Sequence, residues 1–335
     1  MKVAIIGCGG LGNVHADSYT AMPDVTVVGV CDLEEAHARA VANKTGAHIY
    51  ADYDQMLAES GCDIVSIALP SHLHAEFAIR AARAGKHVIC EKPIALRSED
   101  AERMVSECEQ HGVGLYVGHV VRFFPEYVRV KNQIADGKLG QIGVVHAKRA
   151  GGHPGLARSW FANDNLSGGV VVDLMVHDLD FLSWALGEVS SVYAFRQRSE
   201  WQDYATATLR FKNGTIANVE AHWGYPGGFH TMLEVAGSSG TVRHDSRNSN
   251  SLTIRKAASQ QEGARFAEIP QRPETLNPYA KELRHFIECI RTGGQPIVTG
   301  RDACRALELA LAVVESAETG RVVYPAALST KGETK

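Results

Sequence analysis

The stretch KVAIIGCGGLGNVHA, residues 2–16, decides the fold of the N-terminal part of this chain. It opens with a short apolar run that predicts a strand, and the glycines that follow stand in G-x-G-x-x-G spacing at Gly7, Gly9 and Gly12. Gly7 allows a tight turn, Gly9 lets the backbone approach a pyrophosphate, and Gly12 permits close packing of the next helix, whose N-terminus would face the phosphates. The stretch therefore predicts a dinucleotide-binding turn.

Asp32 strengthens this prediction, because it ends the second predicted strand about twenty residues after the glycines. A carboxylate there would accept hydrogen bonds from both ribose hydroxyls of an adenosine and would repel the 2′-phosphate of NADP. No arginine follows Asp32 until Arg39, so the sequence favours NAD over NADP. The alternative is a glycine turn with an incidental surface aspartate.

The N-terminal part also predicts a parallel sheet. Further strands are expected at residues 25–31, 63–69, 86–90 and 113–117. Helix-like stretches such as LEEAHARAVANKTG and HAEFAIRAARAG lie between them. Strands that alternate with helices are typical of a doubly wound α/β fold.

From about residue 140 the pattern changes to longer strands joined by turns such as KNGT and GSSG. These strands are expected at residues 142–149, 189–198, 203–211, 215–222 and 230–236. They predict a mostly antiparallel sheet in a second, α+β domain. Two helical stretches follow, at roughly residues 278–292 and 301–319.

The composition limits the class of protein. The chain has 335 residues, 45% of them hydrophobic, which favours two domains with substantial cores. No run of about 20 apolar residues occurs, so no membrane span is expected. The start MKVAIIGCGG has too short an apolar run for a signal peptide, so we expect a cytoplasmic protein. The net charge of −4 gives no reason to expect a nucleic acid or an anionic membrane as a partner.

The stretch GKHVICEKP, residues 85–93, contains a candidate catalytic lysine. Proline lacks an N–H group, so Pro93 should end strand pairing and leave Lys92 at the carboxyl end of a parallel strand, where open α/β sheets bind ligands. A lysine near a nicotinamide ring could donate a hydrogen bond to a reacting oxygen, and Glu91 could orient it. The alternative is a lysine that caps a solvent-facing loop.

The stretch SGGVVVDLMVHDLD, residues 167–180, places charged groups in an otherwise apolar element. An apolar interior rejects unpaired charge, so Asp173, His177 and Asp180 are either paired or face a cleft. Asp173 and His177 are four residues apart, which places them on one face of a helix. Asp180 is expected to be structural.

A metal site is not expected. Asp173, His177 and Asp180 with a distant histidine could in principle bind a divalent cation, but no recognised ligand motif is present. The seven cysteines form no C-x-x-C pair, which argues against a zinc knuckle and a disulfide framework.

Five segments together resemble the Gfo/Idh/MocA oxidoreductases. They are AIIGCGGLGNVHA, LPSHLHAEFAIRAARAGKHVICEKPIAL, GHVVRFFPEY, SGGVVVDLMVHDLDFLSWALGEVSSVYA and YAKELRHFIECIRTGG. The resemblance implies an NAD-binding Rossmann domain at residues 1–122. It also implies an α+β domain at residues 123–335, which binds substrate and forms homodimers or homotetramers through an open-faced sheet.

The resemblance further implies a dehydrogenase that acts on a hydroxyl of a small polyhydroxylated substrate, with Lys92, Asp173 and His177 as its catalytic residues. His177 would be the general acid or base, Asp173 would orient the substrate, and Lys92 would polarise the reacting oxygen. The expected cofactor contacts are Gly7, Cys8, Gly9, Gly10, Leu11, Gly12, Asp32, Leu69, Pro70, His72, His74, Glu91 and Lys92. His15 is expected to pack and hydrogen-bond inside the fold.

Substrate specificity is assigned to the loop GGHPGLARSWFANDNL, residues 151–166, which combines hydrogen-bond donors with aromatic rings. The expected substrate contacts are Arg122, Arg158 and Trp160 in addition to the three catalytic residues. Residues 167–180 look closest to the inositol 2-dehydrogenase branch, whereas RSWF departs from it, so the expected class is a cyclitol or sugar. A surface loop of the same composition is the alternative.

Other functions remain open. The fold also serves regulators that bind a dinucleotide or a sugar without turnover, reductases of C=N or C=C bonds, and hydrolases that use NAD transiently. Lys92 and His177 are both present, which favours the dehydrogenase over the regulator.

Overall fold

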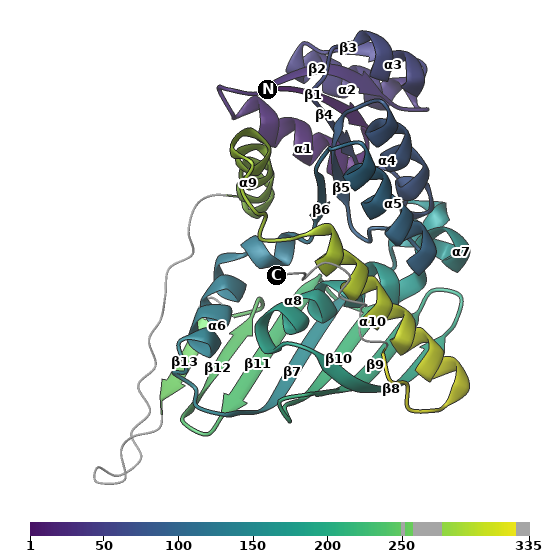
Figure 1. The fold of residues 1–335 in the computed structure, drawn as a ribbon. Helices are drawn as coiled ribbons and strands as arrows, with labels where there is room; N and C mark the ends of the chain where they lie inside the picture. The colour runs from purple at the N-terminus through teal and green to yellow at the C-terminus, as the bar shows by residue number, and fades with distance from the viewer. Residues whose placement is uncertain (249–251, 257–276, 326–335) are drawn as a thin grey trace. The chain divides into compact units, whose positions relative to one another are not determined.

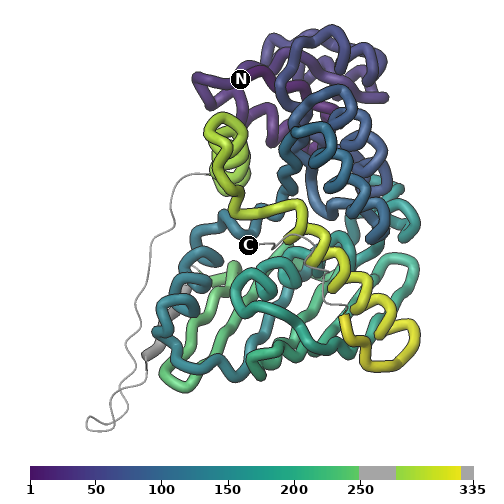
Figure 2. Tube along the Cα trace, viewed as in Figure 1, coloured from purple at the N-terminus to yellow at the C-terminus, as the bar shows by residue number. Residues whose placement is uncertain are grey.

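The structure is a computed structural model, and it describes residues 1–248, 252–256 and 277–325 (Figure 2). The chain forms two compact units. The first unit contains Met1–Pro125, Asn163–Gly168 and a later segment that ends at Leu307. The second unit contains Glu126–Ala162, the chain from Gly169, and the segment from Glu308.

The first unit is built on a six-stranded parallel sheet with the order β3-β2-β1-β4-β5-β6 (Figure 1). Its strands are β1 Lys2–Ile6, β2 Thr26–Cys31, β3 His48–Tyr50, β4 Ile64–Ile67, β5 His87–Glu91 and β6 Leu115–Gly118. Its helices include α1 Gly10–Thr20, α2 Glu35–Thr45, α3 Tyr53–Glu59, α4 His74–Arg83 and α5 Ser98–Gln110. This strand order is that of the Rossmann fold, so the predicted doubly wound sheet is confirmed.

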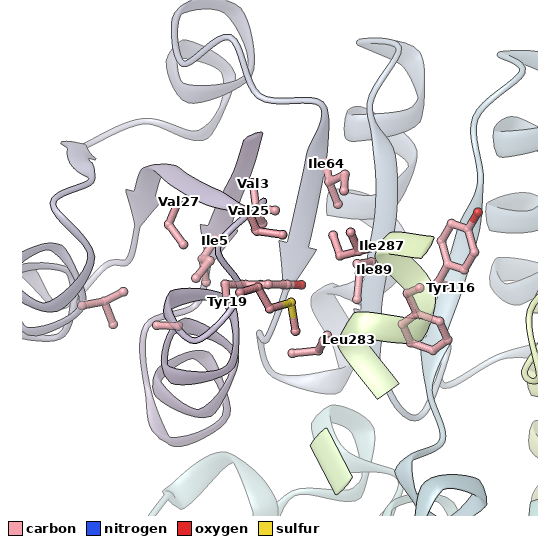
Figure 3. Packing of buried hydrophobic residues seen from close by; sticks show 14 of the residues in the cluster. Val3, Ile5, Tyr19, Val25, Val27, Ile64, Ile89, Tyr116, Leu283 and Ile287 are labelled. Carbon is pink, nitrogen blue, oxygen red and sulfur yellow. The ribbon is translucent and has the colours of Figure 1, made fainter. Parts of the chain in front are cut away.

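The helix α9 (Pro278–Thr292) belongs to the first unit, although the predicted boundary assigns it to the second domain. Leu283, Phe286 and Ile287 are fully buried in one apolar cluster with β1, β4 and α1 (Figure 3). The ring of Phe286 also packs against Tyr116 of β6, with ring centroids 5.4 Å apart. Periodicity predicted the helix but gave no information about its partner. The predicted single boundary between the two domains, after residue 122, stays a prediction.

The second unit is built on a seven-stranded sheet with the order β13-β12-β11-β7-β10-β9-β8. Its strands are β7 Ile142–Gly151, β8 Val189–Arg198, β9 Asp203–Phe211, β10 Ile216–Trp223, β11 His230–Gly237, β12 Gly240–Asp245 and β13 Leu252–Lys256. The sheet is mostly antiparallel, as predicted, but β7 and β10 run parallel to each other. The strands β12 and β13 were not predicted.

Helices cover one face of this second sheet, among them α6 (Pro125–Ala135), α8 (Val176–Leu186) and the later part of α10 (Gly300–Thr319) (Figure 1). Residues of β8 to β11 alternate between buried and more exposed positions, so the other face of the sheet is open. No helix among the described residues is long and apolar enough to cross a membrane.

Candidate functional site

The glycine-rich turn after β1 has the backbone geometry that glycine permits. Gly7 has a φ of +84°, and a Cβ atom there would lie 2.5 Å from the carbonyl oxygen of Ala68. A Cβ atom on Gly12 would lie 1.9 Å from the carbonyl oxygen of Gly7. Both positions therefore exclude larger residues, and the helix α1 starts against the turn as predicted.

Asn13 holds this turn in shape, a role that the sequence analysis missed. Its side-chain amide donates hydrogen bonds to the carbonyl oxygens of Cys8 and Gly9, at 2.8 and 3.0 Å. The sequence signal for this role is an asparagine directly after Gly12, the last glycine of the motif.

Asp32 lies beside the turn, at the end of β2. Its carboxylate accepts hydrogen bonds from the backbone N–H groups of Cys8 at 2.6 Å and Glu34 at 2.8 Å. Leu33, the next residue, is fully exposed. The carboxylate is thus fixed at the edge of the sheet, where the expected ribose hydroxyls would meet it.

The loop after β4 includes Leu69, Pro70 and the exposed His72. It is tied to the loop after β5 by His74, which is buried. Its ring nitrogens lie 2.7 Å from the carbonyl oxygen of Pro93 and 2.9 Å from that of Leu69. Burial lowers the pKa of His74. These contacts show His74 positioning two loops, and its direct contact with a cofactor stays a prediction.

Lys92 follows β5 directly and is only partly buried. Ile67 of β4 pairs with Cys90 of β5 and with Ile6 of β1. The glycine turn, Leu69 and Lys92 consequently share the carboxyl edge of the sheet, as predicted for a ligand-binding edge.

Glu91, beside Lys92, is buried and interacts with His15 of α1. The Oε1 atom of Glu91 lies 2.9 Å from Nε2 of His15, whose Nδ1 lies 2.8 Å from the hydroxyl of Ser66. Burial alone would raise the pKa of Glu91, but the hydrogen bond from His15 and the charges of His15 and Lys92 hold it below the usual value. The expected internal role of His15 is confirmed.

The first unit fits a bound NAD. Gly9 caps the N-terminus of α1 in an extended conformation and, having no side chain, makes no capping hydrogen bond with it. The N–H groups of that first turn can therefore serve a pyrophosphate. Gly7, Cys8, Gly9, Gly10, Leu11 and Gly12 would surround it, and Asp32 would hold the ribose.

Asp173 and His177 lie in the second unit, on a π-helical turn η5 (Val171–Met175) that continues into α8. Both side chains are partly exposed, whereas the residues next to them in sequence are buried. Single π-helical turns inside helices are frequent at functional sites. This partial exposure leaves both side chains accessible, and their contact with a substrate stays a prediction.

The neighbouring carboxylates, Asp178 and Asp180, are buried. Asp178 is buried and accepts two hydrogen bonds from the guanidinium of Arg149, at 3.0 and 3.1 Å. Burial alone would lower the pKa of Arg149, but Asp178 outweighs it and the pKa is raised. Asp180 is also buried, in agreement with its expected structural role. No cluster of three or more His, Cys, Asp or Glu that could hold a metal ion occurs in the described part of the chain.

The three expected substrate residues have different environments. Arg158 is exposed, and Trp160 stacks on Phe161 with ring centroids 3.8 Å apart. Arg122 is buried in the first unit, where it donates a hydrogen bond to the carbonyl oxygen of Ile297 at 2.8 Å and lies 3.6 Å from Asp302. These contacts give Arg122 a structural role, and its contact with substrate stays a prediction.

Comparison with known families supports this interpretation. The model described as "Oxidoreductase family, NAD-binding Rossmann fold", of the Gfo/Idh/MocA group, matches residues 1–119. The model for the C-terminal alpha/beta domain of the same family matches residues 131–325.

Individual proteins are similar over most of the chain. The scyllo-inositol 2-dehydrogenase (NAD(+)) of Bacillus subtilis is 31% identical over 96% of this chain and 96% of its own length. The D-glucoside 3-dehydrogenase of Escherichia coli is 34% identical over 66% of this chain and 69% of its own length. The crystal structure of the WlbA dehydrogenase from Bordetella pertussis, with NADH and UDP-GlcNAcA, matches with a TM-score of 0.84 at 29% identity, covering 98% of this chain and 99% of that one. NAD is thus the cofactor of the first unit, and the chain is an oxidoreductase.

Proposed function

Because this chain belongs to the Gfo/Idh/MocA family of oxidoreductases, we propose that it oxidises a secondary hydroxyl of a sugar or cyclitol with Lys92, Asp173 and His177 in its active site. The partial exposure of Asp173 and His177 within an otherwise buried turn carries this proposal. The inositol dehydrogenase relative supports the substrate class.

Each of the three residues has a chemical role in the proposal. NAD, when bound, accepts the hydride from the hydroxyl-bearing carbon. His177 takes the hydroxyl proton, Asp173 orients the substrate, and Lys92 donates a hydrogen bond to the oxygen as it becomes a carbonyl. In the reverse direction His177 returns the proton.

Initial rates with myo-inositol, scyllo-inositol, glucose and xylose test the proposal, with NAD and NADP as parallel acceptors. We expect one polyol to be oxidised with NAD, and we expect Lys92→Met and His177→Ala each to lower kcat by about 100-fold or more. His111→Ala, which changes an exposed histidine at the end of α5, is the control and should keep the full rate.

The binding of NADH separates the possible results. If fluorescence titration gives both variants the NADH affinity of the wild type, their lower kcat reflects the chemical step and not cofactor binding. A wild-type protein that binds NADH but oxidises none of these polyols would contradict the dehydrogenase and favour the regulator.

We also propose that the protein is a cytoplasmic homodimer or homotetramer that assembles through the open face of the second sheet. Tyr193 and Phe195 are exposed there, on the opposite side of β8 from Ala194, whose N–H binds Ser316 of α10. Light scattering after size-exclusion chromatography should give a mass of two or four chains, and Phe195→Lys should lower it.

A further inference from the structure

One edge of the second sheet carries aromatic residues that the proposed chemistry does not use. The strand register aligns Gly151 at the end of β7, Trp223 at the end of β10 and Asp203 at the start of β9. The side chain of Asp203 accepts a hydrogen bond from the backbone N–H of Val170 at 3.0 Å. The edge therefore also holds the start of the turn that carries Asp173, three residues further on.

Rings from three separate segments meet at this edge and form what we call the edge cluster. Phe161 packs edge-on against Trp223 at a centroid distance of 5.7 Å. His153 packs against Trp223 at 5.4 Å and against Trp201 at 6.1 Å. Trp160, stacked on Phe161, extends the cluster along the loop. The loop that is predicted to set substrate specificity is thus joined to β10 and to the β8–β9 turn.

The edge cluster has a buried base and an exposed rim. Trp223 is only 3% exposed, whereas Trp201 is 47% exposed, and Phe229, which lies beside Gly151 at the same edge and is counted with the cluster, is 64% exposed. Exposed aromatic groups around a buried aromatic base are typical of a binding surface.

Two glycines at the ends of β7 and β10 allow close contacts with Phe229 and Trp201. A Cβ atom on Gly151 would lie 2.8 Å from the ring of Phe229. Gly224 has a φ of +85°, and a Cβ atom there would lie 2.0 Å from the carbonyl oxygen of Trp201. Gly224 therefore lets the backbone of Trp201 lie close to the end of β10, and Gly151 leaves room for the ring of Phe229 at the end of β7.

We propose that the edge cluster binds the second sugar ring of a glycoside, whose first ring is oxidised at Asp173 and His177. This inference rests on the proposed function and narrows its substrate class. Aromatic faces pack against the C–H faces of a pyranose, and the exposed guanidinium of Arg158 offers hydrogen bonds to hydroxyls. Trp201 stands two residues before Asp203, which binds Val170, and Phe229 lies beside Gly151, so both exposed rings lie at the sheet edge that also holds the turn with Asp173.

The reaction leaves the glycosidic bond intact. A C–H bond and an O–H bond of the first ring break, the hydride goes to NAD, the proton goes to His177, and a keto-glycoside forms. The second ring contributes binding only. A substrate that lacks this ring should therefore lose more in kcat/KM than in kcat.

Initial rates with glucose, cellobiose, maltose and gentiobiose, with NAD, test the inference on the full-length chain. We expect at least one disaccharide to exceed glucose in kcat/KM by about tenfold. Trp201→Ala and Phe229→Ala should each remove most of that advantage and leave kcat/KM for glucose unchanged. Tyr324→Ala, which truncates another exposed aromatic residue of the second unit, should change neither value.

Three results would overturn the inference. In one, glucose equals or exceeds every disaccharide. In another, the two variants lose activity on glucose and disaccharide equally. In the third, Trp201→Ala or Phe229→Ala changes the molecular mass of the protein in solution. The edge cluster would then be an interface between copies of the chain.

A binding measurement keeps the inference testable if no sugar is oxidised. Calorimetric titration of the NADH complex with the same disaccharides should then show binding to the wild type that Trp201→Ala weakens by about tenfold. That result would support the edge cluster and contradict the proposed dehydrogenase, whereas equal binding of wild type and variant would overturn the edge cluster.

Discussion

At the scale of single residues, Glu91 shows how the first unit keeps a charge inside its core. Its carboxylate is enclosed next to Lys92, and His15 is the partner that offsets the cost of removing it from water. The sequence predicts that Glu91 orients Lys92 and that His15 is internal. It could not predict that the two side chains meet, because 76 residues separate them in the chain.

Replacement of Glu91 by glutamine should change how the stability of the protein depends on pH. The pKa of Glu91 is below its reference value of 4.5 in the folded protein, so ionised Glu91 stabilises the fold above that pH, and this contribution disappears as the pH falls below it. We expect Glu91→Gln to be less stable than the wild type by about 3 kcal/mol at pH 7, with a smaller difference near pH 4. Urea unfolding at both pH values measures this.

The control for this prediction is Glu107→Gln. Glu107 also has a lowered pKa, because Arg83 donates hydrogen bonds to it, but the Arg83 side chain is 58% exposed, so water screens this ion pair more than that of Glu91. A constant stability difference between Glu91→Gln and the wild type from pH 7 to pH 4 would contradict the interpretation.

At the scale of elements, the turn η5 is held from two sides. Asp203 of β9 binds its start, and Arg149 of β7 binds Asp178 in the helix that follows. Asp173 and His177 lie in sequence between these two contacts. The alternation of charged and apolar residues predicted that some carboxylates would be paired, but not which ones. The three-residue strand β3 was missed because it is too short to show a pattern.

Asp178→Asn should destabilise the protein strongly, because it leaves the buried guanidinium of Arg149 without its counter-charge. We expect a loss of about 3 to 5 kcal/mol in the free energy of unfolding. The double variant Arg149→Met with Asp178→Leu should recover much of this loss, because no buried charge remains. A double variant as unstable as Asp178→Asn alone would show that the pair has a further role.

At the scale of the whole molecule, the core of the first unit is completed by a segment from near the end of the chain. The helix α9 buries Leu283, Phe286 and Ile287 in that core, after the whole of the second sheet has passed in the sequence. The amphipathic pattern of α9 predicted its length correctly. Because an apolar stripe packs equally well on many surfaces, the pattern could not assign the helix to a unit.

A fragment of residues 1–125 should therefore fail to fold alone, since the apolar surface that α9 covers would be exposed. Circular dichroism should show no cooperative thermal transition. A second fragment, in which a flexible linker joins residues 1–125 to residues 277–307, should melt cooperatively and bind NADH. Cooperative folding of the short fragment would show that α9 is dispensable.

The late arrival of α9 also has a consequence for synthesis on the ribosome. At ordinary translation rates, on the order of ten seconds pass between the emergence of the glycine turn and that of α9. The nascent N-terminal segment stays incomplete during this time while the second sheet is being made. We therefore expect a chain that terminates before α9 to lack part of the core under its nucleotide-binding edge and to retain no NAD.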